Sequence, residues 1–210
     1  HDPSVVLTKE GHKIILQFYM YSIYNTIIKH IIMNVGFDLD KIFVNYPPFV
    51  PSKIIDILYK GKPHAELKYR IPGRAEQLLR QLSHYPLFRR PIKENIEFMK
   101  KITSENTHTY YLISSRFGFL KKTTEKLVHT YGIDKIFDGL YFNFSNSQPH
   151  IFKDEIIKKL NVDLYVDDDL QLLEYLSKNN PKVKLFWLNK KQRKQLSKNL
   201  FAIKRLSEMF

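Results

Sequence analysis

Aspartates follow two apolar, β-rich runs of the sequence: Asp38 and Asp40 come after the first run, and Asp167 and Asp168 after a later one. Carboxylates two residues apart at a strand end point the same way, and two such clusters that face each other repel strongly unless a cation lies between them. Oxygen-only ligands of this kind hold a hard divalent ion, and Mg²⁺ is the best match. The spacing therefore predicts a Mg²⁺ site built from the two aspartate clusters.

Other polar residues follow a third apolar run, which lies between these two in the sequence. A lysine precedes the second aspartate cluster. Ser114, Ser115 and Arg116 come after the third run, and Lys153 lies at the start of the helical stretch that leads into the strand before Asp167. Two interpretations of Arg116 stay open, namely contact with a substrate phosphate and an ion pair with a surface acid. The register also leaves open, by one residue, which of the two serines is the functional one.

Short apolar runs that are typical of buried strands must position these residues. Five runs fit this pattern: Ile31–Phe37, Thr109–Ile113, Leu140–Phe144, Val162–Val166 and Val183–Leu188. Helical periodicity separates the last four runs, with Gly132 and Pro181 as helix stop signals. The alternation predicts an α/β fold with a Rossmann-like, mostly parallel sheet and helices on both faces. Open parallel sheets bind ligands at the carboxyl ends of their strands, where the polar residues lie.

The roughly sixty residues between Asn45 and His108 interrupt this alternation, because they show helical patterns and most of the prolines but no obvious strand. The helical patterns cover Ala75–His84 and the apolar positions from Ile92 to Ile102. An insertion of this length exceeds what a connecting loop needs. We therefore predict an α/β core at 31–45 and 109–210, a small helical cap with a return helix at 46–108, and an N-terminal extension of open origin at 1–30.

The N-terminal extension contains the most apolar run of the chain, Lys13–Lys29. Polar residues interrupt this run and it is short for a bilayer span, so the sequence predicts no transmembrane helix. Packing of the run on the core and an interfacial membrane anchor are the two remaining interpretations.

The composition excludes several classes of protein and favours anionic partners. The chain has no cysteine, which excludes disulfide scaffolds, thiolate zinc sites, iron–sulfur clusters and cysteine nucleophiles, and makes the cytoplasm the default location. The 34 Lys and Arg against 21 Asp and Glu produce a formal charge of +13. Such a charge attracts phosphates on a small substrate, a nucleic acid or an anionic membrane, although a merely solvated basic surface is the alternative.

Two basic regions are candidates for substrate contact. The insert carries the first set of cations, which either grip a phosphate or nucleic-acid end or lie in solvent: Arg70, Arg74, Arg80, Arg89 and Arg90. The tail at 190–205 predicts a basic amphipathic helix whose apolar face docks on the sheet, with contact to nucleic acid or membrane as the alternative. The histidines lack metal-ligand spacing and none is nominated, and Trp187 is predicted to lie in the core.

Taken in order, the motifs resemble those of the haloacid dehalogenase superfamily of phosphatases and phosphotransferases. The matches are VGFDLD for the first motif, YYLISS for the second, Lys153 for the third and LYVDD for the fourth, and they span residues 31–190. The family follows its first motif with Gly and then Thr or Val, whereas this chain has Lys41 and Ile42. Lys41 puts a bulky cation where the chain normally turns tightly near the phosphate.

The resemblance implies a role for each matched residue. Asp38 would be the nucleophile that forms an aspartyl-phosphate, and Asp40 the general acid–base. Lys153 would stabilise the Asp38 carboxylate and the transition state, while Ser114 with nearby N–H groups would hold a phosphoryl oxygen. Mg²⁺ would be held by the Asp38 carboxylate, the backbone carbonyl of Asp40 and Asp167, with Asp168 ligating or ordering water.

The activity that the resemblance implies is a Mg²⁺-dependent phosphatase of a small phosphomonoester, with a nucleotide as one candidate substrate. Two alternatives remain: a phosphatase of nucleic-acid ends, suggested by the basic charge, and a basic module that binds nucleic acid or a partner protein with little or no catalysis.

Overall fold

The structure is a computed structural model that describes residues 16–20, 32–47, 67–189 and 194–210. Its centre is a seven-stranded sheet of order β3-β2-β1-β4-β5-β7-β6. Every neighbouring pair is parallel except β6 with β7. The strands are β1 Asn34–Phe37, β2 Thr109–Ser114, β3 Gly139–Phe142, β4 Leu164–Asp167, β5 Lys184–Leu188, β6 Lys194–Gln195 and β7 Leu200–Ile203.

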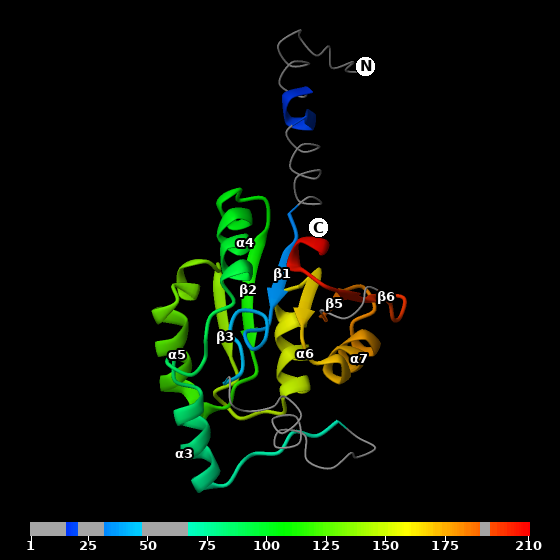
Figure 1. Cartoon of the computed structure of the whole chain (residues 1–210). Helices are drawn as coiled ribbons and strands as arrows, with labels where there is room; N and C mark the ends of the chain where they lie inside the picture. The colour runs from blue at the N-terminus through cyan, green and yellow to red at the C-terminus, as the bar shows by residue number, and fades with distance from the viewer. Residues whose placement is uncertain (1–15, 21–31, 48–66, 190–193) are drawn as a thin grey trace, which may run out of the picture.

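Helices cover both faces of this sheet (Figure 1). The helices are α3 Arg74–Ser83, α4 Lys93–Ser104, α5 Lys121–Thr130, α6 Pro149–Lys159 and α7 Leu170–Asn179. On one face, Met99 of α4 and Leu127 of α5 pack with Phe37 of β1 in a single buried cluster. On the other face, Ile157 of α6 and Leu173 of α7 pack in a second cluster. These observations confirm the predicted α/β class, the parallel sheet and the two helical layers.

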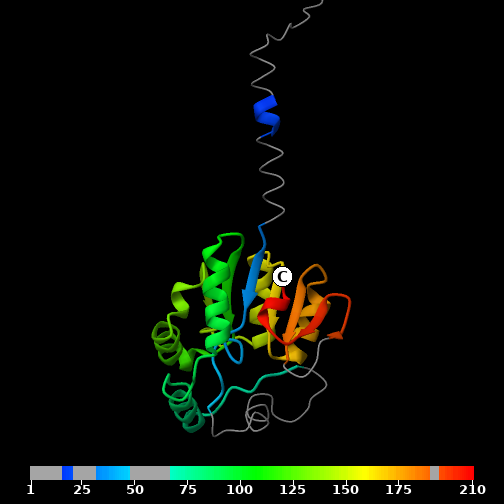
Figure 2. The same cartoon turned by 45° about the horizontal axis from the view of Figure 1, so that its top comes forward.

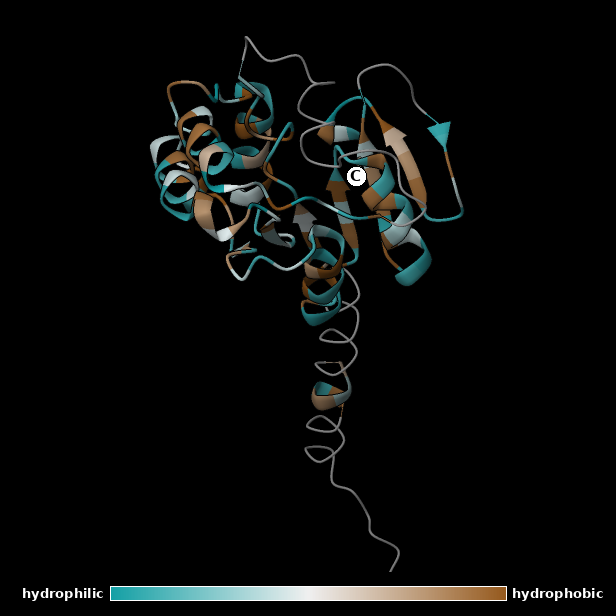
Figure 3. Cartoon of the chain, turned by 90° about the horizontal axis from the view of Figure 1, so that it is seen from below, coloured by the Kyte–Doolittle hydropathy of each residue, from teal (hydrophilic) through white to brown (hydrophobic). Residues whose placement is uncertain are grey.

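The strands are apolar on both sides because both of their faces are covered. In β4, Val166 belongs to the cluster under α4 and α5, whereas the adjacent Tyr165 belongs to the cluster under α6 and α7. Parallel strands of this kind read as continuous apolar runs rather than as alternating ones. Figure 3 shows the result, with largely hydrophobic strands between helices that carry hydrophilic outer surfaces.

Local sequence signals operate at two helix ends, and one of them, Gly132, is a predicted stop signal. Asp169 caps α7, since its side chain accepts hydrogen bonds from the backbone N–H groups of Gln171 and Leu172. Gly132, just beyond α5, has the left-handed conformation with φ of 65°, which glycine adopts without steric cost.

The C-terminal tail corrects our prediction of an amphipathic helix, because it forms β6 and β7 at the edge of the sheet (Figure 2). Leu200, Ala202 and Ile203 are buried, and β7 pairs in parallel with β5. The run from Leu200 to Ile203 is a short apolar stretch with no polar position, which suits a strand covered on both faces. Long-range pairing with β5 therefore outweighs the helical spacing of the leucines.

The described part of the N-terminal extension, residues 16–20, is helical. Its apolar side chains Leu16, Phe18, Tyr19 and Met20 are exposed, so the prediction of packing on the core is wrong for these residues. The rest of the apolar run lies outside the described residues. Within the described ranges, no helix is both long and apolar enough to cross a membrane. The interfacial anchor and the cytoplasmic location stay predictions.

The insert contributes α3, which lies beyond the carboxyl ends of the strands, and α4, which returns to the sheet (Figure 1). Both helices match the predicted helical patterns. Residues 48–66 lie outside the described ranges. The division into core, cap and N-terminal extension therefore stays a prediction.

Gly36 in β1 lets two side chains from neighbouring strands pack closely over the strand. A Cβ atom at this position would lie 2.8 Å from Cδ2 of Tyr165 and 3.0 Å from Cδ1 of Ile113. We expect Gly36→Ala to lower the free energy of unfolding by about 1–3 kcal/mol, as overpacking does in cores. Urea unfolding would measure this loss.

Gly73→Ala is the matched control, because no atom lies within 4 Å of the added Cβ there and only the cap of α3 is affected. Its expected cost is below about 1 kcal/mol. Equal stability losses in the two variants would show that the close contacts over Gly36 do not matter.

Candidate active site

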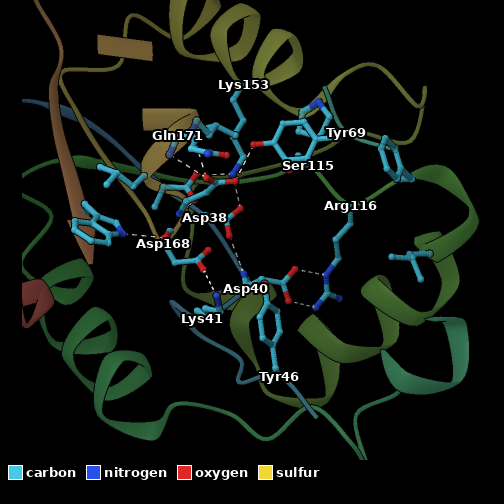
Figure 4. A pocket seen from close by; sticks show the side chains of 18 residues that line it. Asp38, Asp40, Lys41, Tyr46, Tyr69, Ser115, Arg116, Lys153, Asp168 and Gln171 are labelled. Carbon is cyan, nitrogen blue, oxygen red and sulfur yellow. Dashed lines mark hydrogen bonds and ion pairs between the residues drawn. The ribbon is translucent and has the colours of Figure 1, made fainter. Parts of the chain in front are cut away.

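A pocket of about 390 Å³ lies at the carboxyl ends of β1, β2, β4 and β5 (Figure 4). Most of the sequence-predicted site residues line this pocket: Asp38, Asp40, Ser115, Arg116, Lys153, Asp167 and Asp168. Of the predicted residues, only Ser114 is not part of the lining. The topology of the sheet thus brings together side chains that are far apart in the sequence.

Sheet register places the nucleophile candidate beside the second aspartate cluster. Phe37 at the end of β1 pairs with Val166 of β4, so the next residues, Asp38 and Asp167, lie side by side. The backbone N–H of Asp38 continues the ladder by donating to the carbonyl of Val166 at 3.0 Å. Both carboxylates are buried, with exposed fractions of 4% for Asp38 and 1% for Asp167.

Lys153 bridges these two carboxylates from the first turns of α6. Its Nζ donates to Oδ1 of Asp38 at 2.8 Å and to Oδ2 of Asp167 at 2.6 Å. The Tyr165 hydroxyl donates to the same oxygen of Asp167 at 2.9 Å. Burial opposes the charge on Lys153, but the two carboxylates outweigh it and raise the pKa of Lys153 well above its ordinary value.

The electrostatics of the aspartates favour a further cation. Burial, opposed by the charge of Lys153 and assisted by the charge of Asp167, raises the pKa of Asp38 to about 8. Burial likewise raises the pKa of Asp168 to about 7, although Lys41 acts in the opposite direction. A bound divalent cation would favour the ionised form of both carboxyl groups.

Three of the carboxylates lie close enough together to share a metal ion. Asp38, Asp167 and Asp168 each offer one oxygen, and these oxygens all lie within 4.8 Å of one another. This all-oxygen donor set suits a hard divalent cation such as Mg²⁺. The backbone carbonyl of Asp40 as a further ligand stays a prediction.

The Asp40 carboxylate is held by two buried arginines (Figure 4 shows Arg116). Arg116 donates from Nε and from one terminal nitrogen to the two carboxylate oxygens, at 2.8 Å each. Arg89 adds an ion pair at 3.3 Å. Although burial raises the pKa of Asp40, the guanidinium groups of Arg116 and Arg89 outweigh it and hold this pKa well below its usual range.

Similar proteins were sought by sequence and by structure. No family model matches the sequence, and no curated protein matches it. The putative HAD-hydrolase YfnB from Bacillus subtilis, in a crystal structure bound to magnesium, aligns with a TM-score of 0.56 at 11% identity, covering 84% of this chain and 96% of that chain. The chain has the haloacid dehalogenase fold.

A second structure of this fold is the haloacid dehalogenase-like family protein SP0104 from Streptococcus pneumoniae. It aligns with a TM-score of 0.50 at 14% identity, covering 76% of this chain and 86% of that chain. The resemblance read from the four motifs is therefore confirmed at the level of the fold. The roles that it implies for individual residues stay predictions.

Sheet register within the haloacid dehalogenase fold separates the two serines. β2 pairs with β1 so that Tyr111 lies beside Gly36, which puts Ser115 on the same side of the sheet as Asp38. Ser115 lines the pocket. The Ser114 hydroxyl is buried, and no hydrogen-bond partner for it occurs among the described residues. The geometry thus favours Ser115 over Ser114 as the serine that meets a ligand.

Arg116 and Arg89 both pair with Asp40, and the burial of Arg89 corrects the prediction that it lies in solvent. Of the two interpretations of Arg116, an ion pair is present, with the partly exposed carboxylate of Asp40 at 2.8 Å, and contact with a substrate phosphate stays a prediction. Arg89, predicted to grip a phosphate or lie in solvent, is only 1% exposed and pairs with the same carboxylate. Arg80 is also buried, beside Glu76, whereas Arg74 is exposed as the solvent interpretation expects.

His84 supports Arg89, and sequence reasoning missed it. Its Nε2 lies within hydrogen-bond distance of Arg89, and its Nδ1 lies 2.7 Å from the carbonyl oxygen of Arg80. A carbonyl only accepts, so Nδ1 carries the proton and Nε2 accepts from Arg89. Burial, together with the charge of Arg89, lowers the pKa of His84 well below its ordinary value, in keeping with a neutral ring. The spacing of the histidines contains no signal for this contact.

Two aromatic residues also line the pocket in ways that the sequence did not indicate. Tyr69 from the insert donates its hydroxyl to Oδ2 of Asp169 at 2.7 Å. Trp187, predicted to be in the core, does lie in β5 but is only partly buried, and its indole N–H donates to the backbone carbonyl of Asp168 at 2.9 Å. Trp187 therefore contacts the second aspartate cluster, and Tyr69 contacts the adjacent Asp169.

Proposed function

We propose that this chain is a Mg²⁺-dependent phosphatase that hydrolyses a small phosphomonoester through an aspartyl-phosphate on Asp38. The observation that carries the proposal is the buried Asp38 carboxylate, held by Lys153 and flanked by Asp167 and Asp168 at the ligand-binding edge of the sheet. YfnB, which has the same fold, is a putative hydrolase whose crystal structure holds magnesium, and this supports both the reaction class and the metal.

The three aspartates would hold the metal ion. Asp38, Asp167 and Asp168 offer the oxygen donors, and bound Mg²⁺ would neutralise the repulsion between an anionic nucleophile and an anionic phosphate.

Asp38 is held in place by both of its oxygens. Lys153 donates to Oδ1, and the backbone N–H of Asp40 donates to Oδ2 at 2.9 Å. In the first step an oxygen of Asp38 forms a bond to phosphorus while the bond from phosphorus to the leaving oxygen breaks. In the second step water attacks the same phosphorus, which releases phosphate and restores the carboxylate. Lys153 and Ser115, which line the pocket, would stabilise the phosphoryl oxygens.

Asp40 would serve as the general acid–base of both steps. This role requires the carboxylate to leave Arg116, because a carboxylate paired with two guanidinium groups holds no proton to donate. An aryl phosphate has a leaving group that needs little protonation. It is therefore the substrate least affected by the state of Asp40.

A nucleotide is the substrate that the lining of the pocket favours. Tyr46, Tyr69, Phe117 and Trp187 line the pocket near the aspartates and supply aromatic surface that a base can contact. The net charge of +13 also favours a longer anionic substrate, such as the end of a nucleic acid.

The test is the hydrolysis of p-nitrophenyl phosphate by the full chain in Mg²⁺ and in EDTA, followed by a panel of nucleoside monophosphates, sugar phosphates and phosphate-terminated oligonucleotides. We expect turnover in Mg²⁺ and loss of turnover in EDTA, with nucleoside monophosphates as the best physiological class. Absence of turnover by folded, Mg²⁺-saturated protein on every substrate would contradict the proposal. Salt-dependent binding of polynucleotide would then indicate the basic binding module instead.

A further inference from the structure

Lys41 has a backbone conformation that a lysine adopts only at a cost. Its φ is 57°, in the left-handed region that favours glycine. The turn is tight, because the backbone N–H of Lys41 donates to the carbonyl of Val44 at 2.8 Å. Glycine would satisfy this backbone better than lysine does. A lysine at such a position suggests that its side chain has a function.

The side chain of Lys41 lies on the second aspartate cluster (Figure 4). Its Nζ is 2.9 Å from Oδ2 of Asp168, and it lies 4.4 Å from the centre of the Tyr46 ring. Asp168 is one of the three aspartates that could share a metal ion. Lys41 therefore occupies a carboxylate that the metal would use.

Each aspartate of the two clusters has a cationic partner without a metal ion. Four carboxylates contact four cationic side chains: Asp38, Asp40, Asp167 and Asp168 with Lys41, Lys153, Arg89 and Arg116. A bound divalent cation would add two positive charges to this group. A phosphomonoester dianion would cancel them. These eight side chains, counted without the neighbouring Asp169, carry no net formal charge, and their sum is zero again when both the metal and a phosphate dianion are added.

We propose that Lys41 is an exchangeable counter-ion of Asp168, which a divalent cation displaces and which then pairs with the phosphate of the substrate. This inference rests on the proposed function. The ammonium group of Lys41 is at the end of a flexible, partly exposed side chain, so it can move without repacking the core. The buried Lys153 cannot move in this way. It follows that Lys41 weakens metal binding to the free protein and strengthens phosphate binding to the metal-loaded protein. Metal and phosphate then bind cooperatively.

The test measures metal and phosphate affinity separately, without turnover. Trp187 is the single tryptophan of the chain and donates to the carbonyl of Asp168, so its fluorescence reports on this site. Titration with Mg²⁺, checked by calorimetry, yields the metal Kd. Titration of the Mg²⁺-saturated protein with inorganic phosphate yields the phosphate Kd. We expect Lys41→Met to bind Mg²⁺ about 5- to 10-fold more tightly than wild type and phosphate about 5- to 10-fold more weakly, as expected for one partly exposed ion pair.

Two further variants separate the charge from the backbone. Lys41→Arg keeps the charge and is expected to keep both affinities within about 3-fold of wild type. Lys41→Gly removes the charge and relieves the left-handed backbone, so it folds at least as well as wild type and is expected to show the same opposite shifts as Lys41→Met.

The opposite signs identify the counter-ion role, because damage to the site would weaken both ligands together. Unchanged or weaker Mg²⁺ binding in both Lys41→Met and Lys41→Gly, with wild-type Mg²⁺ binding intact, would overturn this inference and leave the proposed function standing. Absence of Mg²⁺ binding in wild type and variants alike would overturn both.

Discussion

Replacing Asp38 with asparagine is expected to reduce phosphate release from an aryl phosphate by a factor of about 10⁴ or more. The amide has nearly the same shape as the carboxylate, but it is uncharged and is not a competent nucleophile. Lys153 keeps its contact with Asp167 in this variant, so the fold is expected to persist. Steady-state hydrolysis in saturating Mg²⁺, together with a thermal unfolding curve, would measure both effects.

Asp163→Asn is the matched control for this variant. Asp163 precedes β4, at the opposite end of the strands from the pocket. Its carboxylate accepts a hydrogen bond from the backbone N–H of Asn34 at 2.8 Å. The chemical change is the same as at Asp38, and turnover is expected to stay close to that of wild type. A folded Asp38→Asn variant that retains a tenth or more of wild-type turnover would exclude Asp38 as the nucleophile.

Replacing Lys153 with methionine is expected to lower the free energy of unfolding by about 3–5 kcal/mol in EDTA. Lys153 is 2% exposed and pairs with two carboxylates that are themselves buried, so the removal of its ammonium group leaves both of them without this cation. Mg²⁺ is expected to recover part of the loss, because a cation bound by the same carboxylates stabilises the folded state by mass action. Urea unfolding in EDTA and in Mg²⁺ would measure the two quantities.

Lys158→Met is the matched control on the same helix. Lys158 also forms an ion pair, with Asp154 at 2.6 Å, but its side chain is 54% exposed. Exposed pairs of this kind contribute about 0–1 kcal/mol, so the expected loss is small and independent of Mg²⁺. If Lys153→Met costs no more than Lys158→Met, the bridge between Asp38 and Asp167 does not hold the site together.

The sequence predicts the sheet and the gathering of the aspartates because both depend on local pattern and simple topology. Apolar runs that end in polar residues mark the parallel strands, and the carboxyl ends of parallel strands meet at one edge. Asp38 and Asp167 are 129 residues apart in the chain, yet their positions after two strands suffice to predict that they lie together. Lys153 lies in the first turns of the helix that leads into β4, close to the helix start where the sequence analysis put it.

The details that the sequence could not predict depend on single-residue register or on long-range pairing. The choice between Ser114 and Ser115 needs the pairing of β2 with β1, since a shift by one residue reverses every side chain. The ion pairs of Asp40 join residues that are 76 and 49 positions apart, one of them in the insert, and no spacing rule relates them. The tail contains apolar residues at helical spacing. It forms a strand because it pairs with β5, and the local sequence does not show this pairing.

The most direct test of the central claim is to look for the phosphoryl group on Asp38 during turnover. Full-length protein, Mg²⁺ and an aryl phosphate would be mixed, quenched in acid within milliseconds to seconds, digested and analysed by mass spectrometry. The account predicts an acid-stable, hydroxylamine-labile phosphoryl group on the peptide that contains Asp38, and its absence from Asp38→Asn. Turnover with no phosphoryl group on that peptide at any time point, or with the group on another residue, would contradict it.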